Sequence, residues 1–200
     1  MFAGTAYCTA LNDRRQLEAL DSAFHEAPYG APPKAPVLYM KPGHCVVPGG
    51  STIAFPAGCD ALGVAATIAL QWTVTGPTAV RLAIDLSVPH ESFYRPAVAE
   101  LACDGFLPVG PAIALPADLA TLDIVTEIDG DEVYRWNLSS LFRDIPTLIA
   151  DVTVFMTPMP GDMLLVGTPG DRPLARGGSV IRVSATGFAP LEVRLAGAGA

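Results

Sequence analysis

Apolar residues occur in short runs along this chain, and turn-forming residues separate the runs. Nineteen glycines and nineteen prolines divide the 200 residues into many short segments. Short apolar segments bounded by glycine and proline are typical of β-strands joined by irregular loops. The pattern predicts ten strands, at residues 2–10, 36–41, 65–74, 79–86, 105–109, 122–128, 132–136, 163–167, 179–185 and 191–195. Asp129-Gly130 lies between two of them and predicts a tight hairpin turn.

Two other segments have helical periodicity. Residues 14–26 place Leu17, Leu20 and Phe24 on one face, as an amphipathic helix requires. Residues 145–156 form the second predicted helix. With two helices and ten strands, the predicted fold class is α+β and β-rich, with a mixed sheet rolled into a barrel-like core.

Length and hydrophobicity together predict one domain. Half of the residues are hydrophobic, and a chain of this size buries roughly 70% of its unfolded surface. We expect a single domain over residues 1–200, in which 1–60 form a strand and helix lobe and 61–200 form the β-rich core.

The charge and the cysteine content limit which partners the protein could bind and in which cellular compartment it is expected. The formal net charge is −8, and the basic residues form no cluster, which argues against nucleic-acid binding. The longest apolar stretch, residues 61–70, is too short to span a bilayer, and residues 1–20 do not have the pattern of a secretory signal. The four cysteines show no C-x-x-C spacing. These features predict a cytoplasmic protein with reduced thiols and no membrane partner.

The segment PGDMLLVGTPGDRP, residues 160–173, predicts a turn, a short buried strand and a second turn. Gly167 leaves the backbone open to close approach by a ligand, and Thr168 adds one hydroxyl group. An ordinary strand end that enters a loop explains the same residues, and on this segment alone that interpretation is favoured.

Six segments in a fixed order raise the significance of that motif. They are ALNDRRQLEAL (10–20), FHEAPYGAPPKAPVLYMKPG (24–43), VPHESFYRPA (88–97), DGFLPVGPAIAL (104–115), TEIDG (126–130) and the PGDMLLVGTPG block. This series resembles the fumarylacetoacetate hydrolase family over nearly the whole chain. Within the family it is most similar to the N-terminal half of members that act as both isomerase and decarboxylase in 4-hydroxyphenylacetate breakdown.

The resemblance implies a divalent metal site, Mg²⁺ or Mn²⁺, formed by a Glu-x-Glu pair on one strand and an Asp on a later strand. At the matching positions this chain has Ala65, Thr67 and Asp85. Asp85 is then either the last ligand of the metal or a strand-end carboxylate that accepts a backbone hydrogen bond. Because one carboxylate holds Mg²⁺ poorly, the second interpretation is favoured.

Further family positions are also replaced. The resemblance implies a His-x-x-Glu acid/base pair and a lysine that faces the substrate carboxylate. This chain has Gln16 and Ala19 in place of the pair, and Leu101 in place of the lysine.

Several residues could still bind an anion. The pocket candidates are Lys41, Arg95 and Thr168, and a dicarboxylic 2-oxo acid would contact Arg95 and the Gly167-Thr168 backbone. An ion pair at the surface or between subunits also explains Arg95, and that interpretation is favoured over ligand binding.

Other candidate chemistry is weak. His44 and Cys45 are adjacent, but a nucleophilic pair depends on spatial rather than sequential proximity. His90 and Glu91 resemble the start of the His-Glu motif of zinc proteases, but the second histidine of that motif is missing, so we exclude a zinc site there.

Three functions remain open. In the first, implied by the resemblance, the chain is a subunit of an isomerase/decarboxylase for small 2-oxo or 2-hydroxydienoic di- and tricarboxylic acids, and a metal in a partner chain carries the chemistry. In the second it is a catalytically silent half that completes a dimer. In the third it is a binding module for a small carboxylic acid. We expect a homodimer or a heterodimer with a homologous catalytic half, and little or no activity in the isolated chain.

Overall fold

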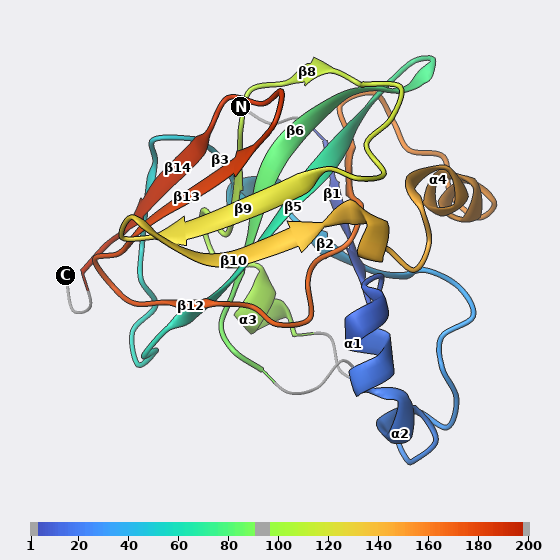
Figure 1. The fold of residues 1–200 in the computed structure, drawn as a ribbon, viewed down its shortest axis with the longest axis horizontal. Coiled ribbons are helices and arrows are strands. Elements are labelled where there is room, and N and C mark those ends of the chain that lie inside the picture. The colour runs from blue at the N-terminus through green and yellow to red at the C-terminus, as the bar shows by residue number, and fades with distance from the viewer. Residues whose placement is uncertain (1–3, 91–96, 198–200) are drawn as a thin grey trace.

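The structure is a computed structural model that describes residues 4–90 and 97–197. Most of its regular elements are strands, with a few short helices outside them (Figure 1). The strands are β1 Ala6–Ala10, β2 Val37–Lys41, β3 Val46–Pro48, β4 Thr52–Ile53, β5 Leu62–Thr73, β6 Gly76–Ser87, β7 Leu107–Val109, β8 Ile113–Ala114, β9 Asp123–Ile128, β10 Asp131–Asn137, β11 Met163–Leu165, β12 Leu174–Ala175, β13 Val180–Ala185 and β14 Leu191–Leu195. The helices are α1 Arg14–Ala19, α2 Asp21–Phe24, α3 Val98–Leu101 and α4 Ile145–Thr153, with 3-10 turns η1 Gly43–Cys45 and η2 Leu138–Ser140.

The strands form two mixed sheets. The larger has nine strands in the order β2-β1-β11-β5-β6-β7-β3, with β12 paired to β5 and β8 to β6. The smaller has five, in the order β10-β9-β13-β14-β4. Parallel pairing occurs between β1 and β11, between β3 and β7, and between β14 and β4. The predicted β-rich α+β class with a rolled mixed sheet is confirmed.

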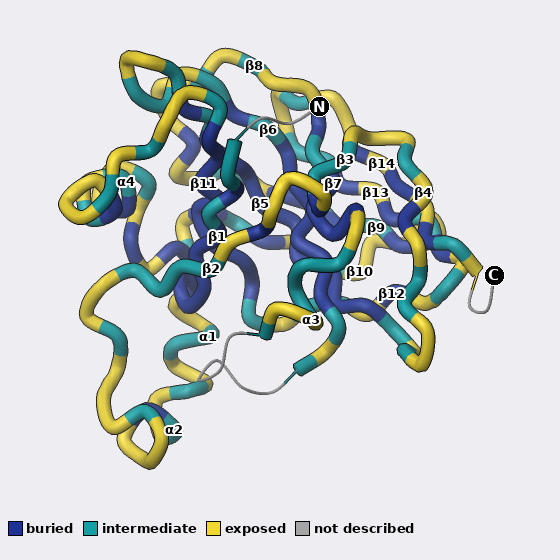
Figure 2. Tube along the Cα trace, turned by 180° about the vertical axis from the view of Figure 1, so that it is seen from behind, coloured by how far each residue is buried: buried dark blue, intermediate teal, exposed yellow. Residues whose placement is uncertain are grey.

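The long hairpin of β5 and β6 supplies both the core and the floor of the candidate site. Even-numbered residues of both strands, such as Ile68 and Ile84, pack against the smaller sheet in the main hydrophobic core. Odd-numbered residues face the other way, because successive strand side chains alternate. Ala65 lies directly opposite Asp85 on that second face. Figure 2 shows the buried residues concentrated along these central strands.

All ten predicted strand regions contain a strand, and the predicted turn at Asp129-Gly130 joins β9 to β10. Both turn residues have positive φ, 55° and 93°, as a tight hairpin of this type requires. Four strands of two or three residues, namely β3, β4, β8 and β12, were not predicted. They are too short to show an alternating pattern.

The predicted helix over residues 14–26 is wrong as a single element. The chain forms α1 and α2, which meet at Leu20, where φ is −97° and ψ is 0°. Leu17, Leu20 and Phe24 nevertheless belong to one small apolar cluster. The second predicted helix is present as α4, whose N-cap Asp144 accepts a hydrogen bond from the Thr147 backbone.

Residues 1–60 and 61–200 share both sheets. Strand β1 lies between β2 and β11 in the larger sheet, and β4 pairs with β14 in the smaller one. All four cysteines are free, as predicted. Among the described residues, no helix has the length and apolar character needed to cross a bilayer.

The Asn12 side chain joins three segments behind the candidate site. It is fully buried two residues after the end of β1, and its amide nitrogen donates to the Arg143 and Val166 carbonyls at 3.0 and 2.7 Å. Its oxygen accepts from the Arg143 backbone N–H at 2.8 Å. A Cβ on Gly167 would lie 3.1 Å from the Asn12 Cβ, so glycine allows this close approach. Gly167 therefore has a packing role.

We predict that Asn12→Ala lowers the free energy of unfolding by about 3 kcal/mol or more, because it leaves three buried backbone groups without partners. Asn137→Ala is the matched control: this asparagine also forms three hydrogen bonds, but they are exposed to solvent. Its replacement should lower the free energy of unfolding by about 1 kcal/mol. Urea denaturation measures both, and equal losses would contradict a special role for Asn12.

Candidate functional site

A buried ionic cluster lies on the second face of β5 and β6. Asp85 Oδ1 is 2.7 Å from Lys41 Nζ, and Oδ2 is 3.0 Å from Arg172 Nη1. The Tyr39 hydroxyl donates to Asp85 Oδ2 at 2.6 Å. The side chains of Asp85 and Lys41 are fully buried, whereas that of Arg172 is 21% exposed. Two cations thus surround one carboxylate, which leaves one net positive charge.

The curl of the larger sheet brings these residues together. Tyr39 and Lys41 are two residues apart in β2, so their side chains lie on the same face of the sheet. Three strands lie between β2 and β6, and in a flat sheet this would separate the two strands by about 19 Å. The 2.7 Å contact between Lys41 and Asp85 therefore requires a strongly concave sheet.

Electrostatics fixes the charge state of the cluster. Burial by itself would raise the pKa of Asp85, but the charges of Lys41 and Arg172 outweigh burial and hold this pKa below its usual value. Burial and the nearby Asp85 charge raise the pKa of Tyr39 well above its usual value. Asp85 is therefore ionised and Tyr39 neutral at pH 7. Burial, followed by the Asp85 charge, also raises the pKa of the Cys8 thiol, which makes it a poor nucleophile.

Asp85 was expected to bind backbone, and this detail is wrong. Its partners are the side chains of Tyr39, Lys41 and Arg172. A fully buried charge requires counter-charges because desolvation of an ion costs several kcal/mol.

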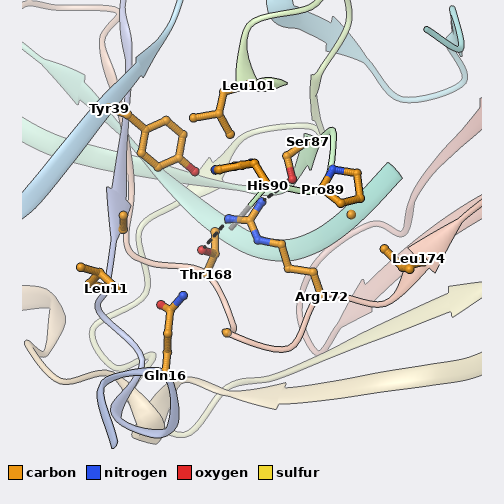
Figure 3. Close-up of a pocket in the computed structure, with 13 residues that line it drawn as sticks. Leu11, Gln16, Tyr39, Ser87, Pro89, His90, Leu101, Thr168, Arg172 and Leu174 are labelled. Atoms are coloured by element: carbon orange, nitrogen blue, oxygen red, sulfur yellow. Dashed lines mark hydrogen bonds between the residues drawn. The ribbon is translucent and has the colours of Figure 1, made fainter. Parts of the chain in front are cut away.

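A cavity of about 250 Å³ opens beside the cluster (Figure 3). Its polar side chains come from four parts of the chain. Arg172 lies at its centre, where Nη1 donates to Ser87 Oγ at 3.0 Å and Nη2 to Thr168 Oγ1 at 3.1 Å. Gln16 enters from α1, and the apolar walls include Leu11, Leu101 and Leu174.

The structure brings together some of the predicted site residues and not others. Thr168 lines the cavity, but Gly167 does not. Lys41 is buried outside the cavity lining, where Nζ also donates to the carbonyls of Leu86 and Phe106. Lys41 therefore stabilises the strand ends. Arg95 lies outside the described residues, and its predicted contact with a ligand stays a prediction.

Two of the positions that the resemblance implies are replaced, Gln16 and Leu101, lie at the same cavity. Gln16 and Leu101 both line it, as does His90, whose Nδ1 lies 3.0 Å from the Val88 carbonyl. His44 and Cys45 lie in η1, away from the residues that line the cavity. The ring Nε2 of His44 contacts the Ala102 carbonyl.

The residues at the implied metal position do not fit a divalent cation. Ala65 lies opposite Asp85 and supplies no ligand, and the Thr67 hydroxyl donates to the Gly167 carbonyl at 2.6 Å. Both Asp85 oxygens contact cations. Mg²⁺ and Mn²⁺ prefer several oxygen ligands with negative charge, whereas this cluster is already positive. The described residues contain no group of three or more His, Cys, Asp or Glu side chains that could hold a metal.

Sequence reasoning missed Arg172, Ser87 and Tyr39. Arg172 follows the GTPG turn by two residues, and Tyr39 precedes Lys41 by two on the same predicted strand. Strand alternation could have placed Tyr39 beside Lys41. Nothing in the sequence indicated that the loop after Gly170 folds back onto Asp85.

Sequence comparison finds similar proteins over almost the whole chain. The family described as "Fumarylacetoacetate (FAA) hydrolase C-terminal" matches residues 5–73 and 78–196. The 4-hydroxyphenylacetate degradation bifunctional isomerase/decarboxylase of Escherichia coli is 41% identical over 94% of this chain. Its counterpart in Salmonella dublin is 40% identical over the same share. In each case the match spans 46% of the length of the relative.

Solved structures show the same fold. The 5-carboxymethyl-2-hydroxymuconate delta-isomerase of Mycobacterium smegmatis superimposes with a TM-score of 0.81 at 22% identity, covering 100% of this chain and 81% of that one. A fumarylpyruvate hydrolase of Pseudomonas aeruginosa, solved with Mn²⁺ and pyruvate, gives a TM-score of 0.77 at 19% identity, covering 96% of this chain and 89% of that one.

We predict that Asp85→Asn lowers the free energy of unfolding by about 3–5 kcal/mol, because it leaves two buried cations without a counter-charge. Glu132→Gln is the control: this residue pairs with Arg135 at 2.8 Å, but both side chains are about half exposed. The control should lose about 0–1 kcal/mol. Chemical denaturation at pH 7 compares the two, and a loss near that of the control for Asp85→Asn would contradict the buried ion pairs.

Proposed function

Because this chain belongs to the fumarylacetoacetate hydrolase family, we propose that it is one subunit of a cytoplasmic isomerase/decarboxylase of aromatic catabolism. The proposed substrates are 2-hydroxyhepta-2,4-diene-1,7-dioate and 5-oxopent-3-ene-1,2,5-tricarboxylate. The names of the bifunctional relatives support the reaction class. The 46% coverage of those relatives supports assignment to one half of such an enzyme.

The contacts of Asp85 are the main support for proposing that a homologous half, and not this chain, binds the metal. In this chain the carboxylate is enclosed by Lys41, Arg172 and Tyr39, and its cross-strand neighbour is Ala65. A divalent ion here would meet two fixed positive charges and one carboxylate, which disfavours binding.

The proposed partner is that homologous half, or a second copy of this chain. Exposed apolar side chains follow α4, where Val154, Phe155 and Met159 are 85%, 60% and 62% exposed. Such residues support an interface on this side of the molecule.

A second candidate is a catalytically silent half that only completes the dimer. The substitutions at Gln16 and Leu101 favour it, because both line the cavity without a group that titrates near neutral pH. The two candidates differ in one measurable respect. Changes in the cavity of this chain alter turnover of the complex only if this half takes part in substrate handling.

The decisive experiment combines this chain with a homologous half that retains Glu-x-Glu. We predict that the two co-purify, that metal analysis finds Mn²⁺ bound to the partner, and that only the complex turns over the dienedioate. The chain alone should retain substoichiometric Mn²⁺ after gel filtration and show no turnover. Stoichiometric Mn²⁺ on the chain alone, together with turnover, would overturn the proposal.

A further inference from the structure

Arg172 occupies the position beside Asp85 that the family resemblance assigns to a metal. Its Nη1 contacts Asp85 and Ser87, and its Nη2 contacts Thr168. These contacts fix the guanidinium plane on one side and leave the side chain 21% exposed toward the cavity (Figure 3). Within the described residues, no acceptor bonds to its Nε–H. A fixed cation, whose Nε–H has no acceptor in the part of the chain that the structure describes, therefore faces an open cavity.

The charge of the cluster selects an anion. Within residues 4–90 and 97–197, Asp85 is the one carboxylate in an ion pair with Lys41 or Arg172, so a positive charge remains in a poorly solvated place. A guanidinium binds a carboxylate through two parallel hydrogen bonds, and it needs no metal to do so. Asp13 is buried behind the cavity wall, where its Oδ2 accepts from the backbone N–H of Gly170 at 3.2 Å, but Asp13 itself is not part of the cavity lining.

Gln16 indicates a second property of the ligand, a hydrogen-bond donor. Its Oε1 atom is buried and has no hydrogen-bond partner among the described residues, and its side chain points into the cavity below Thr168 (Figure 3). A Cβ on Gly170 would lie 2.8 Å from the Gln16 Cβ, so glycine at that position allows α1 to approach this closely. A buried acceptor without a partner is costly unless a ligand or water supplies a donor. A hydroxyl group next to the bound carboxylate would satisfy it.

We propose that this cavity is a metal-independent site for a small 2-hydroxy carboxylate, in which Arg172 binds the carboxylate and Gln16 accepts from the hydroxyl. Thr168 and Ser87 hold the guanidinium in place. The apolar walls of Leu11, Leu101 and Leu174 accommodate a hydrocarbon chain. The inference deepens the proposed function and rests on its premise that this half does not use the metal.

The test uses the full chain in EDTA with two probes, 2-hydroxyhexanoate and hexanoate, and calorimetry as the measurement. Both probes should bind saturably, the hydroxy acid about 5-fold more tightly, since one neutral hydrogen bond contributes about 1 kcal/mol. Gln16→Leu should abolish that preference. Arg172→Gln should weaken both probes by at least about 10-fold, as expected for a charge-assisted bond. Arg176→Gln, at an exposed arginine outside the cavity, should leave binding unchanged.

Arg172→Gln removes a counter-charge from Asp85 and could prevent folding. In that case Thr168→Val decides, because it removes one hydroxyl without changing charge, and it should weaken both probes by about 3-fold. Absence of saturable binding, a requirement for Mn²⁺, or unchanged affinity in the deciding variant would overturn the inference. Failure of the chain to join a metal-binding partner would overturn the proposed function alone, because the cavity is tested without a partner.

Discussion

The contact of Asp85 with Lys41 and Arg172 is the constraint on which the rest of this molecule depends. The lysine comes from β2, which three strands separate from β6 in sheet order, and the arginine comes from the loop between β11 and β12. Both cations reach one carboxylate only if the sheet is curled and the 168–172 loop is closed over it. Removal of either cation from Asp85 leaves a buried charge without its counter-charge, so sheet curvature and loop position are coupled.

The long β5 and β6 hairpin divides the molecule into two chemical environments. One face carries large aliphatic side chains that pack on the smaller sheet. The other carries small residues, including Ala65, Ala69 and Ala83, next to the charged cluster. Small side chains leave room on the concave face for Tyr39, Lys41 and Arg172 to enter. The same backbone could hold carboxylates at positions 65 and 67, and this chain instead uses the space for cations from elsewhere.

Membership of the family and possession of its metal site are separate properties here. The fold agrees with that of the fumarylpyruvate hydrolase solved with Mn²⁺ and pyruvate. Fold similarity reports the scaffold, whereas chemistry depends on the side chains placed on it. In this chain the guanidinium of Arg172 lies beside Asp85. A guanidinium can form directional hydrogen bonds to an anion without a metal ion.

The sequence by itself determined the β-rich class, the regions of the ten main strands, the Asp129-Gly130 turn and the family. Those features depend on local alternation, turn chemistry and motif order, which neighbouring residues encode. Only the tertiary structure decided the partners of Asp85, the burial of Lys41, the break between α1 and α2, and the central place of Arg172. These depend on contacts between segments that are far apart in the chain, and the curl of the sheet sets such distances without a local sequence signal.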